Sequence, residues 1–253
     1  MNAMKKVILI LVDGMRPDAM MQCGHAYSEE LLKQASYTLE GKTVYPSDTL
    51  PCHISLFTAV DPIQHQTTSN TYCPPVNKVR GMVEQLDAAG KKAAMFYNWG
   101  ELRDIAKPGI FNFSLFMRDE KDAAITDYAI EYIKKNSPDF TFLYLGNVDI
   151  FGHHHRWMSE KYLNSVNTAV ECIKRVIDTF GDEYTYIITA DHGGHEHDHG
   201  STMPEDINIP ILFIGEDFEK GKQIEARIID IAPTVCDLLE VNKQECWEGK
   251  SIL

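Results

Sequence analysis

The feature that most constrains the fold is a set of short, wholly apolar segments that recur along the chain. The first, Val7–Val12, is rich in β-branched residues. A strand covered on one face alternates apolar and polar residues, whereas a strand buried on both faces is apolar throughout. We therefore predict a central strand here. Similar segments predict four more strands, over Ala93–Tyr97, Phe140–Leu145, 184–189 and 209–214.

Amphipathic stretches with helical spacing lie between these segments. The stretch 28–35 opens with Ser-Glu-Glu, as a capped helix does, and the stretch 76–89 ends at Gly90, a residue that favours a helix C-terminus. Because strands that alternate with helices indicate βαβ units, we predict an α/β fold with a mostly parallel sheet. Further helices are predicted over 121–135, 159–180 and 232–239.

The chain shows no internal division. No repeat, low-complexity tract or linker separates parts of the 253 residues, so we expect one domain over 1–253. The least regular stretch is 67–122, which contains Pro74-Pro75 and Pro108-Gly109. We expect this stretch to form a lid or small insertion over the sheet.

Charge and cysteine content limit the partners and the compartment. Acidic residues outnumber basic ones 37 to 24, for a net charge of −13. This argues against a nucleic-acid polymer or an anionic membrane as the partner, but not against a small anionic substrate beside bound cations. Six scattered cysteines without CxxC spacing are not typical of a disulfide framework, and Val7–Val12 is too short for a signal peptide or a membrane span. We expect a soluble cytoplasmic protein.

Three of the apolar segments are followed closely by an aspartate: Asp13, Asp149 and Asp191. In an open parallel sheet, ligands bind beyond the carboxyl ends of the strands, so these carboxylates should meet at one edge. An aspartate there can also simply cap the next helix or turn. Three in equivalent places, two of them with histidines nearby, favour a metal site.

The histidines are concentrated in the same part of the chain. Seven of the ten lie between His153 and His199, and carboxylate with imidazole suits zinc or a similar divalent ion. The segment His195–His199 formally matches the HExxH motif of zinc peptidases, but that motif requires a helix. Here Gly193-Gly194 precede it and Gly200 follows, which predicts a loop. A solvated loop that binds metal only adventitiously is the alternative.

The segment 45–53 contains the candidate nucleophiles Ser47, Thr49 and Cys52. We predict a helix over 54–60, which would place Thr49 or Cys52 near its N-terminus. That end of a helix favours anions, including a phosphate or a developing alkoxide. An ordinary cap or a buried thiol would explain the same residues.

Taken in order, these motifs resemble the alkaline phosphatase superfamily, and most closely its nucleotide pyrophosphatase/type I phosphodiesterase branch. The resemblance rests on Val12-Asp13-Gly14, 46–53, Asp149-x-x-x-His153, Asp191-His192-Gly193 and His199-Gly200. It implies a three-layer α/β sandwich, two divalent ions (usually zinc, with Mn or Mg as alternatives) and a metal-dependent phosphoric ester hydrolase. It implies Thr49 as the nucleophile, through a phospho-threonine intermediate. The implied ligands are Asp13, Thr49, Asp191 and His192 for one ion, and Asp149, His153 and His199 for the other.

The substrate side departs from the family pattern. Cys52 stands where the family's phosphodiesterases often have Asn, a phosphate-binding residue, and no arginine is placed by a motif; Arg16 and Arg103 are candidates by proximity alone. Because a monoester carries an extra charge and usually needs an added cation, the lack of a motif-placed arginine favours a diester or a nucleotide-like pyrophosphate over a monoester. Tyr72 and Trp99 are the aromatics we expect to stack on a nucleobase, and a role in filling the core is the alternative. A phosphomonoesterase, a phosphomutase on the same fold and a non-catalytic metal-binding protein remain alternatives.

Overall fold

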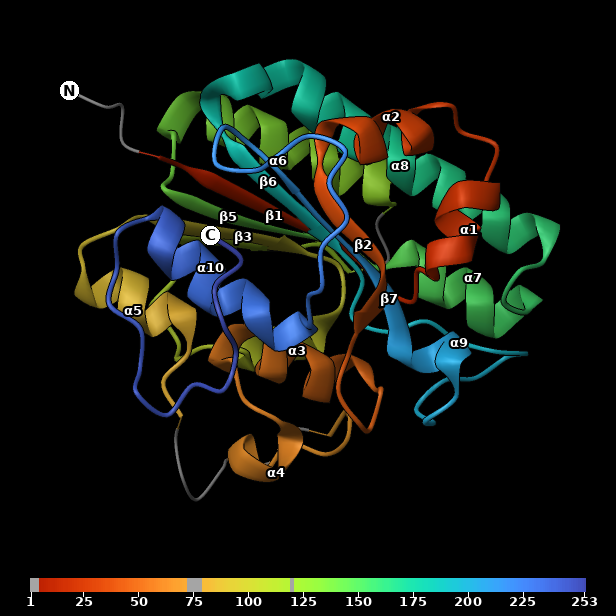
Figure 1. Cartoon of the computed structure of the whole chain (residues 1–253), viewed down its shortest axis with the longest axis horizontal. Helices are drawn as coiled ribbons and strands as arrows, with labels where there is room; N and C mark the ends of the chain where they lie inside the picture. Colours follow the sequence, from red (N-terminus) through yellow and green to blue (C-terminus); the bar gives the residue numbers. More distant parts are fainter. Residues whose placement is uncertain (1–4, 72–78, 119–120) are drawn as a thin grey trace.

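A seven-stranded sheet crosses the centre of the computed structural model, which describes residues 5–71, 79–118 and 121–253 (Figure 1). The strand order is β2-β7-β6-β1-β5-β3-β4. The strands are β1 (Val7–Val12), β2 (Ser36–Lys42), β3 (Ala93–Tyr97), β4 (Phe113–Phe116), β5 (Phe140–Leu145), β6 (Thr185–Thr189) and β7 (Asn208–Ile214).

The sheet is mostly parallel, as predicted. β1 lies in the middle and pairs in parallel with β5 and β6, while β3 pairs in parallel with β5 and β4. Only β7 runs against its neighbours β6 and β2. Every residue of β1 is buried, as its unbroken apolar sequence requires. The carboxyl ends of β1, β5 and β6 therefore meet at one edge of the sheet.

Helices cover both faces of the sheet, which makes a three-layer sandwich (Figure 1). One layer holds α1 (Pro17–Gln22), α2 (Tyr27–Gln34), α6 (Asp122–Asn136), α7 (Asn147–His155) and α8 (Glu160–Phe180). The other holds α3 (Thr49–Thr58), α4 (Pro62–His65), α5 (Met82–Ala88) and α10 (Ile231–Leu238). The short helix α9 (Pro204–Ile207) and the 3-10 turns η1 (Gly100–Asp104), η2 (Gly181–Glu183) and η3 (Ile228–Asp230) complete the elements.

The longest helix, α8, shows how an amphipathic sequence fixes the layers. The Ser159 hydroxyl accepts a hydrogen bond from the Tyr162 N–H and so caps the helix. Val166, Ala169 and Ile173 share one buried face at helical spacing. Burying each large aliphatic side chain contributes about 1.5–3 kcal/mol. Within the part of the chain that the structure describes, no helix is long and apolar enough to cross a bilayer.

The structure differs from the sequence prediction at several elements. β2 and β4 lie at the two sheet edges and are half-exposed, so neither has an unbroken apolar run. The helix predicted over 54–60 begins earlier, at Thr49, because Pro51 lies in its first turn, where no N–H is needed. The helix predicted over 76–89 begins only at Met82, and residues 76–78 lie outside the described part. The described residues of 67–122 supply α5, β3, η1 and β4.

Candidate metal centre

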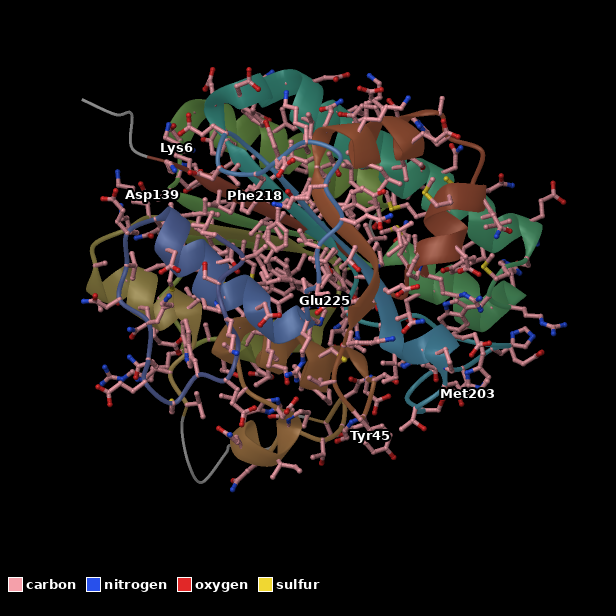
Figure 2. All side chains as sticks on the ribbon, in the orientation of Figure 1. Lys6, Tyr45, Asp139, Met203, Phe218 and Glu225 are labelled. Atoms are coloured by element: carbon pink, nitrogen blue, oxygen red, sulfur yellow. The ribbon has the colours of Figure 1, made fainter. Side chains whose placement is uncertain are left out.

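The three aspartates singled out in the sequence follow three neighbouring strands. Asp13 comes directly after β1, Asp191 comes two residues after β6, and Asp149 lies in the first turn of α7, which follows β5. Figure 2 shows Tyr45 and Met203 at the end of the molecule where these strands finish, opposite Lys6 and Asp139, where β1 and β5 begin. The topology thus brings the carboxylates to one edge.

The first group of side chains is enclosed. Asp13, Asp191 and His192 are buried, and one potential ligand atom of each lies within 4.8 Å of the others. The His192 Nε2 atom is 3.3 Å from Asp13 Oδ1 and 3.5 Å from Asp191 Oδ2. The same Nε2 atom is 3.2 Å from the hydroxyl of Thr49, the first residue of α3. A hydroxyl at a helix N-terminus therefore borders a carboxylate–imidazole group.

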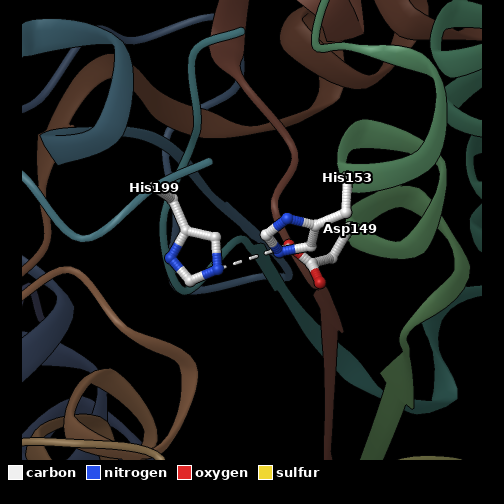
Figure 3. A group of neighbouring side chains, drawn as sticks. All are labelled: Asp149, His153 and His199. Atoms are coloured by element: carbon white, nitrogen blue, oxygen red, sulfur yellow. Dashed lines mark ion pairs between the residues drawn. The ribbon is translucent and has the colours of Figure 1, made fainter. Parts of the chain in front are cut away.

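The second group, called the open group below, is partly open to solvent at His153. Figure 3 shows Asp149 and His153 on α7, with His199 reaching them from the loop after β6. Asp149 Oδ1 lies 3.5 Å from His153 Nε2 and 3.7 Å from His199 Nε2. The His153 side chain is 39% exposed and that of Asp149 15%. The rings of His192 and His199 stack with centroids 3.9 Å apart, so the two groups adjoin.

All three imidazoles of the two groups are oriented in the same way. His192 Nδ1 lies 2.8 Å from Gly193 O, His153 Nδ1 lies 2.8 Å from His197 O, and His199 Nδ1 lies 3.0 Å from Ser47 O. Because a backbone carbonyl only accepts, each Nδ1 must carry the proton. Each Nε2 lone pair then faces its group, as a metal ligand requires.

The carboxylates fit a pair of cations. Among the described residues, Asp13 Oδ1, Asp149 Oδ1 and Asp191 Oδ2 are buried without a hydrogen-bond partner, and each faces an imidazole Nε2 atom. A buried carboxylate is costly unless a charge or hydrogen bonds compensate it. Mixed carboxylate and imidazole donors suit zinc or manganese more than calcium. The chemistry of the two donor sets therefore fits divalent metal ions.

The pKa values of the same residues also reflect buried carboxylates that no positive charge compensates. Burial raises the pKa of Asp13 well above its ordinary value, and the charges of Asp191 and Asp149 raise it further. Burial also raises the pKa of Asp191 and lowers that of His192. Burial, with the neighbouring His192, lowers the pKa of His199 to about 4, so this ring is neutral at physiological pH. Neutral imidazoles beside carboxylates are the state that a metal ion needs.

Further contacts hold the enclosed group in place, and the sequence pattern did not reveal them. The Tyr144 hydroxyl donates to Asp13 Oδ2. Gly14 has φ +66°, its N–H lies 3.2 Å from Asp191 Oδ1, and a Cβ there would come within 3.1 Å of Asp149. His53 is fully buried, and its Nδ1 atom lies 2.7 Å from Thr49 O and 3.4 Å from Asp191 Oδ2.

Asn70 is another residue that the sequence analysis missed. Its Oδ1 atom accepts a hydrogen bond of 2.8 Å from the Leu50 N–H, which places its carboxamide at the N-terminus of α3, beside Thr49. Asn70 lies 20 residues after Leu50 in an irregular stretch, and no local pattern connects the two. Only the tertiary structure shows this contact.

The other candidates for substrate contact lie in different environments. Cys52 is fully buried, with its Sγ atom 3.1 Å from Thr43 Oγ1, and burial raises the pKa of its thiol well above the ordinary value. Ser47 donates its hydroxyl proton to Ser201 O. Trp99 directly precedes η1, just past the carboxyl end of β3, and is half-buried. Tyr72 lies outside the described residues.

The loop histidines outside the two groups, His195 and His197, also bond to the protein. His195 Nδ1 lies 2.8 Å from the buried Asp206 carboxylate, and this bond raises the pKa of His195. His197 Nδ1 lies 2.9 Å from His153 O. The segment is a loop, as predicted, but these two side chains bond to its surroundings.

Solved structures share the fold of this chain. Human ectonucleotide pyrophosphatase/phosphodiesterase 5 matches with a TM-score of 0.84 over 97% of this chain and 97% of its own, at 14% identity. A phosphonate monoester hydrolase from Silicibacter pomeroyi matches with a TM-score of 0.76 over 98% of this chain and 76% of its own, at 15% identity. These likenesses show the alkaline phosphatase-like fold that the sequence motifs predicted.

Sequence comparison then shows the family. Residues 7–208 match the type I phosphodiesterase/nucleotide pyrophosphatase family, and the chain belongs to it, which confirms the resemblance found in the motifs. The 2,3-bisphosphoglycerate-independent phosphoglycerate mutase of Clostridioides difficile is 31% identical over 137 residues, and that of Hahella chejuensis 28% over 177. These matches cover 51% and 65% of this chain but only 26% and 32% of the two mutases. The family and these relatives are phosphoryl-transfer enzymes, hydrolases or mutases.

Proposed function

We propose that this chain is a metal-dependent phosphoric ester hydrolase with Thr49 as its nucleophile. The observation that carries the proposal is the position of the Thr49 hydroxyl, 3.2 Å from His192 Nε2 and at the N-terminus of α3. Such a position stabilises both an alkoxide and a bound phosphoryl oxygen. A structure of murine ectonucleotide pyrophosphatase/phosphodiesterase 5, described as an inactive threonine-to-alanine variant in complex with AMP, supports the role of a threonine.

Two divalent ions, most suitably zinc with manganese or magnesium as alternatives, would occupy the two groups. Bound there, they would lower the pKa of a hydroxyl and of water and offset the charge of the phosphoryl group. The ligands of the enclosed group would be Asp13, Thr49, Asp191 and His192. Those of the open group would be Asp149, His153 and His199.

The chain's own residues then carry the reaction in two displacements. The Thr49 oxygen attacks phosphorus in line, a P–O bond to threonine forms, and the bond to the leaving oxygen breaks toward the open group. Water then attacks the phospho-threonine from that side, breaks the P–O bond to Thr49, and releases the free hydroxyl and a phosphate monoester (inorganic phosphate if the substrate is itself a monoester). The Asn70 carboxamide, held through Leu50 N, supplies an N–H donor for a phosphoryl oxygen.

The exposure of the open group favours hydrolysis over internal transfer. A mutase must keep water from its phosphorylated intermediate, whereas the His153 side chain here is 39% exposed. The phosphoglycerate mutases among the relatives make a mutase the second candidate. Transfer of phosphate between positions of phosphoglycerate without release of inorganic phosphate would identify it. A folded protein that binds metal but does neither would be the non-catalytic alternative.

The charges near the site favour a diester or a nucleotide-like pyrophosphate over a monoester. Among the described residues, no lysine or arginine forms an ion pair with Asp13, Asp149 or Asp191. The Arg16 guanidinium instead bonds Asp18 and Gly194 O. Within the described ranges, a dianionic monoester would therefore find no arginine or lysine already bonded to the ligands of the two groups. Trp99 would form the nucleobase contact, and the lid or insertion expected over 67–122 would border such a substrate.

Thr49→Ala tests the proposal against a matched Thr49→Ser variant, which keeps a hydroxyl. Alanine should reduce turnover of the p-nitrophenyl ester of thymidine monophosphate by at least about 10³-fold, since a nucleophile is lost. The melting temperature should change little, since Thr49 is the first helical residue of α3 and not its N-cap, and a lost hydrogen bond costs about 1 kcal/mol. Metal content is measured beside turnover, because Thr49 is also a proposed ligand of the enclosed group. Serine should retain measurable turnover. Near-normal activity of the alanine variant would contradict the role of Thr49.

A further inference from the structure

The loop that follows β6 carries ligands of both candidate metal groups, and one buried carboxylate outside both groups holds it. Asp206, on α9, is fully buried. Its Oδ1 atom lies 2.8 Å from His195 Nδ1, and its Oδ2 atom accepts a hydrogen bond of 2.9 Å from the Ser201 N–H. His199 lies between these two attachment points. The side chain of Asp206 therefore closes the segment 195–201 into a fixed loop.

The backbone of α9 supports the same loop. The Gly193 N–H donates to Asp206 O and the Gly194 N–H to Glu205 O, both at 2.8 Å. A Cβ on Gly193 would come within 2.0 Å of Glu205 O, so only glycine permits this approach. Burial raises the pKa of Asp206, but the hydrogen bonds from His195 and Ser201 outweigh it and leave the pKa below its ordinary value. The carboxylate is thus ionised, and its hydrogen bonds are charge-assisted.

The two metal groups depend on this loop to different degrees. In the open group, His199 belongs to the loop, and the ring of His153 is oriented by its bond to His197 O. In the enclosed group, His192 lies before the loop and is held by Gly193 O and by the Asp191 carboxylate. Asp13 and Asp191 follow strands of the sheet. The hydrogen bonds of the Asp206 side chain therefore fix the loop that supplies or orients two ligands of the open group, whereas no ligand of the enclosed group is bonded to this side chain and only its charge acts on His192.

We propose that Asp206 is a positioning residue for the open metal group, and that its bonds to His195 and Ser201 set the affinity of that group alone. The inference rests on the metal binding proposed above. It assigns a role to His195, which is not itself a ligand. Residues that orient metal ligands typically contribute about 10–100-fold in metal affinity.

The test is a titration of the metal-free protein with zinc in competition with a chromophoric chelator, without substrate. Two zinc-binding steps are expected. The step that His153→Ala removes belongs to the open group, and the step that Asp13→Asn removes belongs to the enclosed group. Asp206→Ala should weaken the open-group step by about 10–100-fold and leave the other within about twofold. His195→Ala removes the bond between His195 and Asp206 but keeps the Asp206 carboxylate and its bond to Ser201 N. This variant should lose less zinc affinity at the open-group step than Asp206→Ala.

Asp230→Ala is the matched control. Like Asp206, Asp230 accepts two hydrogen bonds through its carboxylate, in this case from the backbone N–H groups of Arg227 and Lys250, but it lies at η3. It should change neither affinity. Three results would each overturn the inference. The folded Asp206→Ala variant could keep both zinc affinities, it could lose affinity equally at both binding steps, or the wild type could show no binding step for the open group. Two ions bound without any ester hydrolysis would contradict the proposed function and leave this inference standing.

Discussion

The titration of one buried carboxyl group, Asp122, should make the free energy of unfolding depend on pH. Asp122 is the first residue of α6 and is 1% exposed. Its Oδ1 atom accepts hydrogen bonds of 3.2 Å from Asn98 Nδ2 and 3.3 Å from Asn147 N, beside the ends of β3 and β5. Burial raises its pKa from 3.8 to about 7, although these hydrogen bonds lower it. The folded protein therefore binds a proton that the unfolded chain releases.

The sign and size of the effect follow from linkage. Because the folded pKa is the higher one, the contribution to stability is fully present below pH 3.8 and is lost as the pH rises to about 7. At about 1.4 kcal/mol per unit, the whole window corresponds to roughly 4 kcal/mol. Asp122→Asn removes the titration. From about pH 5 to about pH 8, the variant should thus gain about 3 kcal/mol relative to the wild type.

Urea unfolding of the metal-free proteins at the two pH values measures this difference. The carboxylates of the metal groups titrate in both proteins, so their contribution cancels. Asp127→Asn, an exposed change on the same helix that removes an ion pair with Arg175, should alter stability by less than about 1 kcal/mol at either pH. An equal difference between Asp122→Asn and wild type at both pH values would refute the raised pKa of Asp122.

Two further predictions concern the metal centre and the substrate. His153→Ala should remove about one ion per chain by elemental analysis and reduce ester hydrolysis at least about 100-fold, while His154→Ala, at the next and exposed position of α7, should change neither; equal effects would contradict the open group. Trp99→Ala should raise KM for the thymidine monophosphate ester by about 5–100-fold, as loss of base stacking would, but not for p-nitrophenyl phosphate. An equal rise for both substrates would make Trp99 structural.

The sequence predicts the centre of the sheet better than its edges, for a physical reason. β1, β3 and β5 are buried on both faces, so burial alone dictates their composition, and the pattern is visible without any partner. β2 contains Gly41, which a register shift in its pairing with β7 accommodates and whose missing Cβ leaves room for Ile209 O. Such a strand is specified by its neighbour, and its own sequence does not show it.

The candidate site likewise contains residues that the sequence pattern reveals and residues that only the fold reveals. Residues that follow buried strands, such as Asp13 and Asp191, can be found by counting along the chain, and the structure brings them together. Residues that support them, such as Tyr144 and Asp206, cannot, because their role depends on contacts across the fold. The bond from Tyr144 to Asp13 spans 131 residues. A tyrosine in an apolar strand gives no sign that its hydroxyl ends beside a carboxylate.

The position of each aspartate relative to its strand accounts for the difference between the two candidate metal groups. Asp13 and Asp191 follow adjacent central strands, β1 and β6, so they are enclosed. Asp149 instead lies within α7, the first helix after β5, one turn before His153, and this moves its group outward to solvent. Thr49 reaches the edge from α3, in the opposite helix layer. A phosphoryl group between the layers would thus meet its nucleophile on the enclosed side and water on the open side, the arrangement that an in-line displacement followed by hydrolysis requires.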